Sequence, residues 1–104
     1  MFDTKDRRRV YWLIDKYLEG TIDTPTFSDE YHACYDLDVD LDTLSEVEKS
    51  ALRILSDVAG RFCKSESAHQ KFPGLYSTDQ DVRQKAKEVK EALADYWPPE
   101  LQNH

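Results

Sequence analysis

Apolar residues recur at three- and four-residue steps along most of the chain, which is the spacing of an α-helix. The first such segment has its apolar face at Val10, Leu13, Ile14, Tyr17 and Leu18. Gly20 follows, and glycine often ends helices because it tolerates the left-handed conformation. A short second helix starts near Pro25, with either Asp23 or Thr24 as its cap. Its apolar face consists of Phe27, Tyr31, Cys34 and Tyr35.

Two longer helices are predicted in the second half of the chain. Ser45 and Glu48 have the spacing of a capping box, so the third helix is expected to begin there. It has the broadest apolar face, which predicts a central position: Val47, Ala51, Leu52, Ile54, Leu55, Val58, Ala59 and Phe62. After a polar loop over residues 64–77, Thr78 and Asp81 repeat the capping pattern. The fourth helix then carries Val82, Ala86, Val89, Leu93 and Tyr96 or Trp97 on its apolar face.

Between the second and third helices, residues 36–42 alternate strictly between aspartate and aliphatic side chains. A period of two is typical of a strand, but aspartate is among the poorest strand formers. We therefore predict an extended connection whose aliphatic side faces the core and whose four aspartates, Asp36, Asp38, Asp40 and Asp42, face outward.

These elements predict an all-α fold, a single antiparallel four-helix bundle. The length of 104 residues suits one domain over residues 1–104, with its core at about residues 8–97 and frayed termini. Pro98 and Pro99 should end the last helix. The two cysteines, Cys34 and Cys63, both lie in apolar helical patterns and are interpreted as small buried side chains.

The charge balance restricts the kinds of partner. With 21 acidic against 14 basic residues the net charge is −7, which argues against direct binding to nucleic acid or to an anionic membrane surface. It favours a basic protein partner. No apolar run approaches the roughly 20 residues of a membrane span, and no secretory segment follows the N-terminus. We expect a cytoplasmic protein, with a monomer favoured and the oligomeric state left open.

The acidic excess is concentrated in residues 21–50, which hold nine acidic residues and one basic residue, Lys49. A solvated face and a favourable helix dipole explain Glu46 and Glu48. They explain the alternating aspartates poorly, because like charges at that spacing repel each other, and proteins accept such repulsion at binding surfaces. The candidate contact residues are Asp29, Glu30, Tyr35, Asp36, Asp38, Asp40, Asp42 and Glu46. Tyr35 is the aromatic anchor of this set, although the helical spacing also suits a core position for it.

The sequence contains no motif typical of a metal site or of a catalytic site. An EF-hand loop starting at Asp36 or Asp38 lacks the glycine and the glutamate that calcium requires. The histidines and cysteines lack the paired spacing of a zinc site. A pair formed by Cys63 and His69 could be drawn in any chain that holds both residue types. We expect no catalytic residues, no metal and no cofactor; an enzyme whose site leaves no sequence signal is the weakest alternative.

Several short segments resemble a family of small bacterial immunity proteins, the group of the colicin D immunity protein and the similar immunity proteins of contact-dependent growth inhibition. The first helical hairpin carries the resemblance in Tyr17-Leu18-Glu19-Gly20-Thr21-Ile22 and in the Phe27 and Tyr31 that follow. The later matching segments are Leu44-Ser45, Asp57-Val58 to Phe62, Val82-Arg83, Val89 and Leu93. The likeness covers about residues 10–95.

This resemblance implies a cytoplasmic helical antidote that binds a cognate toxin nuclease domain, often a tRNase, and covers its active site. It assigns no individual contact residue, so the candidates above rest on charge. The alternative is an acidic adaptor or antitoxin-like bundle, or a nucleic-acid mimic, that regulates a basic protein.

Overall fold

The computed structural model describes residues 6–39, 41–62, 70–71 and 76–101, and the side chains of all of these except residues 36–38, 41 and 100. Its four α-helices are α1 (Arg7–Leu18), α2 (Thr24–Tyr31), α3 (Glu46–Gly60) and α5 (Asp79–Ala92). A π-helix, η1 (His32–Asp38), continues α2 directly. Three short 3₁₀ turns complete the set: η2 (Leu41–Thr43), η3 (Ala94–Tyr96) and η4 (Pro99–Leu101).

Side-chain caps set where the helices begin. The predicted capping boxes at Ser45 and Thr78 are both formed, with Glu48 and Asp81 as the reciprocal partners, and they start α3 and α5. Asp23 is the residue that caps α2, since its carboxylate accepts a hydrogen bond from the amide of Thr26 at 2.9 Å. Each cap satisfies amide groups that a helix start otherwise leaves unpaired.

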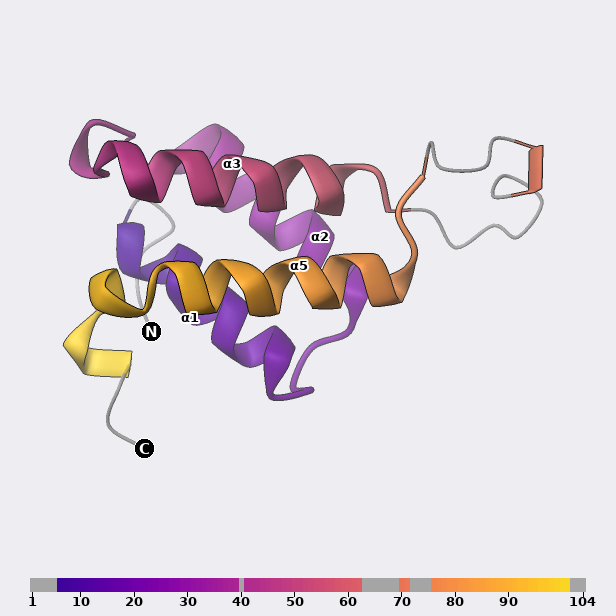
Figure 1. The fold of residues 1–104 in the computed structure, drawn as a ribbon, viewed down its shortest axis with the longest axis horizontal. Coiled ribbons are helices and arrows are strands. Elements are labelled where there is room, and N and C mark those ends of the chain that lie inside the picture. Colours follow the sequence, from indigo (N-terminus) through magenta and orange to yellow (C-terminus); the bar gives the residue numbers. More distant parts are fainter. Residues whose placement is uncertain (1–5, 40, 63–69, 72–75, 102–104) are drawn as a thin grey trace.

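The four helices pack against each other as an antiparallel bundle in up-down-up-down order (Figure 1). Along the chain each helix packs on the next, and α5 closes the bundle by packing on both α3 and α1. Gly20 has a φ of 85°, so the predicted stop after α1 is a left-handed turn. Among the described residues no strand forms. The fold class predicted from the sequence is confirmed.

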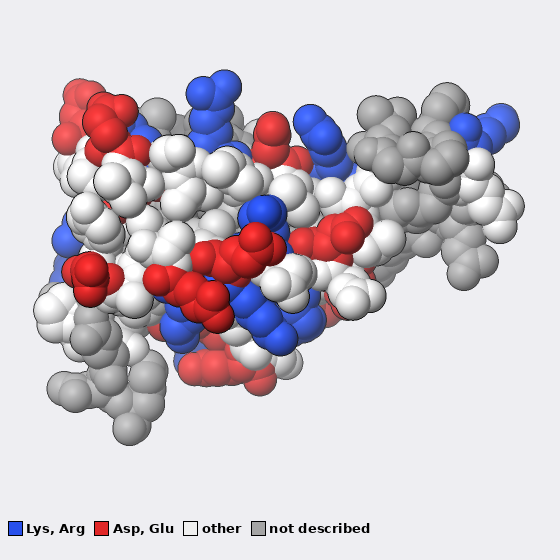
Figure 2. All heavy atoms as spheres, viewed as in Figure 1, with Lys and Arg blue, Asp and Glu red and all other residues white. Residues whose placement is uncertain are grey.

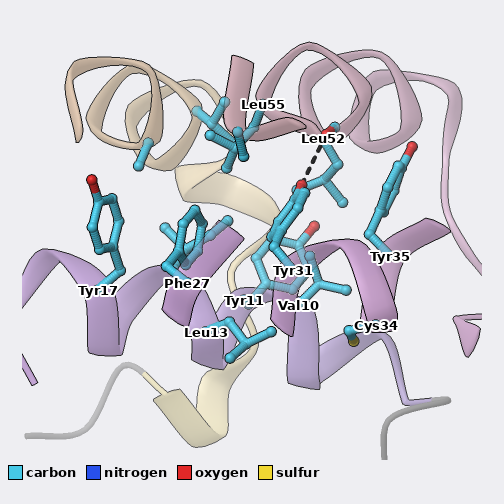
Figure 3. Packing of buried hydrophobic residues seen from close by; sticks show 14 of the residues in the cluster. Val10, Tyr11, Leu13, Tyr17, Phe27, Tyr31, Cys34, Tyr35, Leu52 and Leu55 are labelled. Atoms are coloured by element: carbon cyan, nitrogen blue, oxygen red, sulfur yellow. Dashed lines mark hydrogen bonds between the residues drawn. The ribbon is translucent and has the colours of Figure 1, made fainter. Parts of the chain in front are cut away.

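An aromatic row forms one side of the core (Figure 3). Tyr17 stacks on Phe27 with ring centroids 4.3 Å apart, and the row continues through Tyr31 to Tyr35 at 5.3 and 5.6 Å. The hydroxyl groups of Tyr31 and Tyr35 donate to the backbone oxygens of Leu52 and Lys49 on α3, at 2.8 and 3.3 Å. These contacts fix α2 and η1 against α3.

A buried carboxylate ties α1 to the other end of the chain. Asp15 is 3% exposed and accepts hydrogen bonds from Lys90 Nζ at 2.6 Å and from Trp97 Nε1 at 3.0 Å. Buried acids are tolerated when they are paired in this way. The core continues to Leu101, which is 8% exposed, beyond the predicted limit at residue 97. Leu101 is therefore packed rather than frayed.

The prediction of an extended connection over residues 36–42 is wrong. Residues 36–38 belong to the π-helix, whose 5-residue hydrogen bond runs from the amide of Val39 to the oxygen of Cys34 at 2.7 Å, and residues 41–43 form the 3₁₀ turn η2. Asp40 lies outside the described residues. An extended segment beside the core needs a neighbouring strand to satisfy its backbone groups, whereas a helix satisfies them within the segment. Val39 is buried, as the alternation predicts.

The predicted apolar face of α3 is too broad. The helix buries Leu52, Leu55 and Ala59 but leaves Val47 and Ile54 about half exposed. At the end of α5, Trp97 is the buried member of the predicted pair and Tyr96 is 38% exposed. Glu48 also points inward, so the buried stripe of α3 consists of Glu48, Leu52, Leu55 and Ala59 at helical spacing. The neighbouring helices cover this stripe, and Val47 and Ile54 lie outside it. No helix within the described part of the chain is long and apolar enough to cross a bilayer.

Candidate functional site

Two exposed acidic residues of the middle of the chain, Asp42 and Glu46, lie at the end of the bundle where α3 begins. We use the term acidic end for residues 36–46, which comprise the last turn of η1, the turn η2 and the start of α3. Figure 2 shows acidic side chains gathered over the start of α3, while acidic and basic side chains interleave over α5. The acidic end carries five of the candidate contact residues: Asp36, Asp38, Asp40, Asp42 and Glu46.

Two of these carboxylates have described side chains and both point to solvent. Asp42 is exposed, and the side chain of Glu46 is 90% exposed. Glu46 accepts from Lys49 Nζ at 2.9 Å, and this hydrogen bond, with the charge of Glu46, raises the pKa of Lys49. The side chains of Asp36 and Asp38 and the whole of Asp40 lie outside the described part, so their predicted role stays a prediction.

Glu48, counted with the acidic excess in the sequence, is in fact buried at 4% exposure. One carboxylate oxygen accepts from Tyr11 Oη and from Arg7 Nη1, the latter at 3.2 Å, and the other accepts from the amide of Ser45 at 3.0 Å. Burial by itself would raise the pKa of Glu48, but these hydrogen bonds outweigh it and hold that pKa below its usual range. Glu48 thus joins α3 to α1 and is unavailable to a partner.

The same contact predicts a pH effect at Tyr11. Burial, together with the hydrogen bond to Glu48 and its negative charge, raises the pKa of Tyr11 well above its usual value. Because the pKa of Tyr11 is higher in the folded than in the unfolded protein, its contribution to the free energy of unfolding is complete well below about pH 10 and is lost as the pH rises through that value. We therefore expect the stability difference between the wild type and Tyr11→Phe, measured by urea unfolding, to shrink from about pH 9 to about pH 11. A stability difference for Tyr11→Phe that stays constant over this range would contradict the prediction.

A groove of about 640 Å³ runs along α3 beside the acidic end. Tyr35 and Glu46 of the candidate set line it together with Lys49, Ser50, Arg53, Ile54 and Asp57. Tyr35 is only 7% exposed, and its ring packs on Tyr31 in the core. The structure therefore places Tyr35 in the wall of a groove, not as a projecting side chain.

The other two candidates lie apart from this groove. Asp29 is exposed beside a second hollow of about 460 Å³, which the end of α3 lines with Ala59 and Gly60. Glu30 is paired with Arg9 of α1, with Glu30 Oε2 and Arg9 Nη2 3.6 Å apart. The structure thus brings Tyr35, Asp42 and Glu46 to the start of α3 and places Asp29 at its end.

Sequence reasoning missed the exposed apolar residues of α3, Val47 and Ile54, which are 51% and 49% exposed. A signal for them exists in the sequence. Glu48, Leu52, Leu55 and Ala59 follow a complete helical core stripe, and Val47 and Ile54 fall on the adjacent face. Apolar character alone does not separate this exposed face from the core stripe.

The described residues contain no group of three or more His, Cys, Asp and Glu side chains arranged to hold a metal ion. Cys34 is buried, as predicted, and His32 is exposed, whereas Cys63 and His69 lie outside the described ranges. No family model matches the chain, and no curated protein and no solved structure shows significant similarity to it.

Proposed function

We propose that this chain is a binding protein that neutralises a bacterial toxin nuclease by covering its basic active site with the acidic end. One observation carries the proposal: most of the candidate acidic residues occupy residues 36–46, at one end of the bundle, next to the groove along α3. The described carboxylates of this end, Asp42 and Glu46, are exposed.

The chemistry of the partner supports this assignment. A nuclease holds the phosphates of its substrate with arginine and lysine side chains, so its active site is positively charged. Carboxylates on a protein surface offer the same cations an alternative set of anionic oxygens. Charges of opposite sign also accelerate the encounter of the two proteins. An acidic end is thus suited to block such a site without any chemical step.

The packing behind the acidic end also supports the proposal. Cys34 and Tyr35 are buried on η1, Val39 is buried at its end and Leu44 is buried just before α3, so described residues on both sides of Asp40 are attached to the core. A surface that is ordered before binding loses little conformational entropy in the complex. In addition, π-helices are rare in proteins and frequently occur at functional sites.

The resemblance of residues 10–95 to colicin D-type immunity proteins makes a toxin nuclease the favoured class of basic partner. An acidic adaptor or antitoxin-like protein would use the same surface toward a different basic protein. The position of the gene separates the two, because an immunity gene directly follows the gene of its toxin.

The test is a binding experiment with the toxin domain encoded directly upstream, in a salt series with a nuclease assay in parallel. We expect tight binding that abolishes cleavage, with an association rate that falls about tenfold or more between about 50 and about 500 mM NaCl, because salt screens charge steering. Binding that is independent of salt would refute the role of the acidic end. The absence of binding would refute the immunity function and favour the adaptor.

A further inference from the structure

The proposed function assigns no role to the exposed apolar side chains of α3, although Ile54 lines the groove beside the acidic end. Val47 and Ile54 lie two helical turns apart, each about half exposed, with the smaller Ala51 between them. On the side of α5 this face continues into a shallow hollow of about 260 Å³ lined by Ala51, Ile54, Lys85, Glu88, Val89 and Ala92. Figure 2 shows uncharged surface between the first part of α3 and the last part of α5, with acidic and basic side chains beside it. Grouped apolar side chains at a surface mark an interaction site.

The charges along α3 change sign from its start to its end. Asp42 and Glu46 stand at the start, whereas the exposed Arg53 lies two turns after Glu46 and Arg61, 60% exposed, ends the helix. Asp57 lies between these two arginines and is paired with Arg61 at 3.8 Å. Residues 51–104 hold eight acidic and eight basic residues, so the chain from Ala51 onward has no net charge.

We propose that this face binds a second copy of the chain, with the two α3 helices antiparallel about a two-fold axis. A two-fold interface uses the same patch on both molecules, so the patch must be complementary to itself. With the axis between Ser50 and Ala51, Val47 of one copy lies at the same level as Ile54 of the other. The small side chains at the centre let the two helices approach closely.

The electrostatics select the antiparallel arrangement. At this register Glu46 of one copy lies about 3 Å along the axis from Arg53 of the second copy, within the reach of the long arginine side chain. A parallel arrangement would instead place the two acidic ends side by side. The face therefore suits a second copy better than a basic protein, which would be attracted to the acidic end and not to the neutral stripe.

This self-association does not depend on the proposed toxin partner. Because the stripe is narrower than a standard interface, we expect a reversible dimer with a Kd of about 10–100 µM. Sedimentation of the full chain from about 1 µM to about 1 mM should show the mass rising toward twice that of the monomer. A monomer throughout this range would overturn the proposal.

Two variants locate the interface. Ile54→Glu puts a charge into the stripe opposite Val47 of the other copy and should weaken dimerisation at least tenfold, with an unchanged circular dichroism spectrum because the side chain is half exposed. Gln80→Glu adds the same charge at an exposed position near the start of α5 that lines neither hollow between α3 and α5, and should leave the dimer intact. Equal dimerisation of Ile54→Glu and the wild type would place any dimer elsewhere and overturn the assignment.

Cross-linking determines the orientation. In a Cys63→Ser background, Ser50→Cys lies next to the axis and should form an intermolecular disulfide under mild oxidation, because bridged Cα atoms must lie within about 7 Å. Asp57→Cys is the control, since the antiparallel register separates the two copies of residue 57 by about 20 Å along the axis. Efficient cross-linking at position 57, or none at position 50, would overturn the antiparallel arrangement.

Discussion

Replacing Glu48 by alanine is expected to lower the free energy of unfolding by about 2–4 kcal/mol, which corresponds to a fall in Tm of about 10–20 °C for a domain of this size. The substitution removes the acceptor of the buried Tyr11 hydroxyl and half of the capping box that starts α3. A buried hydroxyl without an acceptor and a lost cap both destabilise the folded state. Thermal unfolding followed by circular dichroism measures the effect.

The matched control is Glu46→Ala, two residues earlier on the same helix. Glu46 is 90% exposed and pairs only with Lys49 among the described contacts, so its removal should change stability by less than about 0.5 kcal/mol. Glu48→Gln keeps the volume and one acceptor oxygen, and should give an intermediate loss. Similar losses for Glu46→Ala and Glu48→Ala would show that Glu48 is not the contact that joins α3 to α1.

Neutralising the four aspartates of the acidic end is expected to slow association with a basic toxin domain about 10- to 100-fold at low salt. The variant carries asparagine at positions 36, 38, 40 and 42, and so loses four of the five candidate carboxylates of this end. Removing the mutual repulsion of these charges should leave the helical fold intact. Stopped-flow or surface-based kinetics with the toxin domain encoded upstream measures the rate.

The control for this variant changes the net charge by the same amount at another place. Glu19→Gln, Glu88→Gln, Glu91→Gln and Asp95→Asn neutralise four exposed acidic residues at the end of α1, on α5 and on η3. If position matters, this variant should associate at a rate within about threefold of the wild type. Equal slowing in both variants would mean that overall charge, and not the acidic end, steers the partner.

Local sequence signals predicted the helices well. Capping depends on a few neighbouring residues, so Ser45 with Glu48 and Thr78 with Asp81 identified the starts of α3 and α5. Gly20 identified the end of α1 for the same local reason. The helical period gave four amphipathic segments, and four such segments joined in one chain of this length form an all-α bundle.

Predictions that depended on contacts with distant parts of the chain were less accurate. Residues 36–42 alternate as a strand would, but no neighbouring strand is present among the described residues to pair with them, and the backbone closes on itself as a π-helix and a 3₁₀ turn. The helical spacing of Tyr35 suits both an anchor at the surface and a position in the core. Its contact with Tyr31 and the backbone of α3 places it in the core wall.

The sequence by itself determined the helices, the capping boxes of α3 and α5, the all-α class and the concentration of acidic residues in the middle of the chain, because each depends on the order and spacing of nearby residues. Only the tertiary structure decided which of those residues face solvent. It turned Glu48 inward to Tyr11 and Arg7 and left Val47 and Ile54 outside. The physical reason is that burial depends on which helix lies opposite each position, and local spacing does not contain that information.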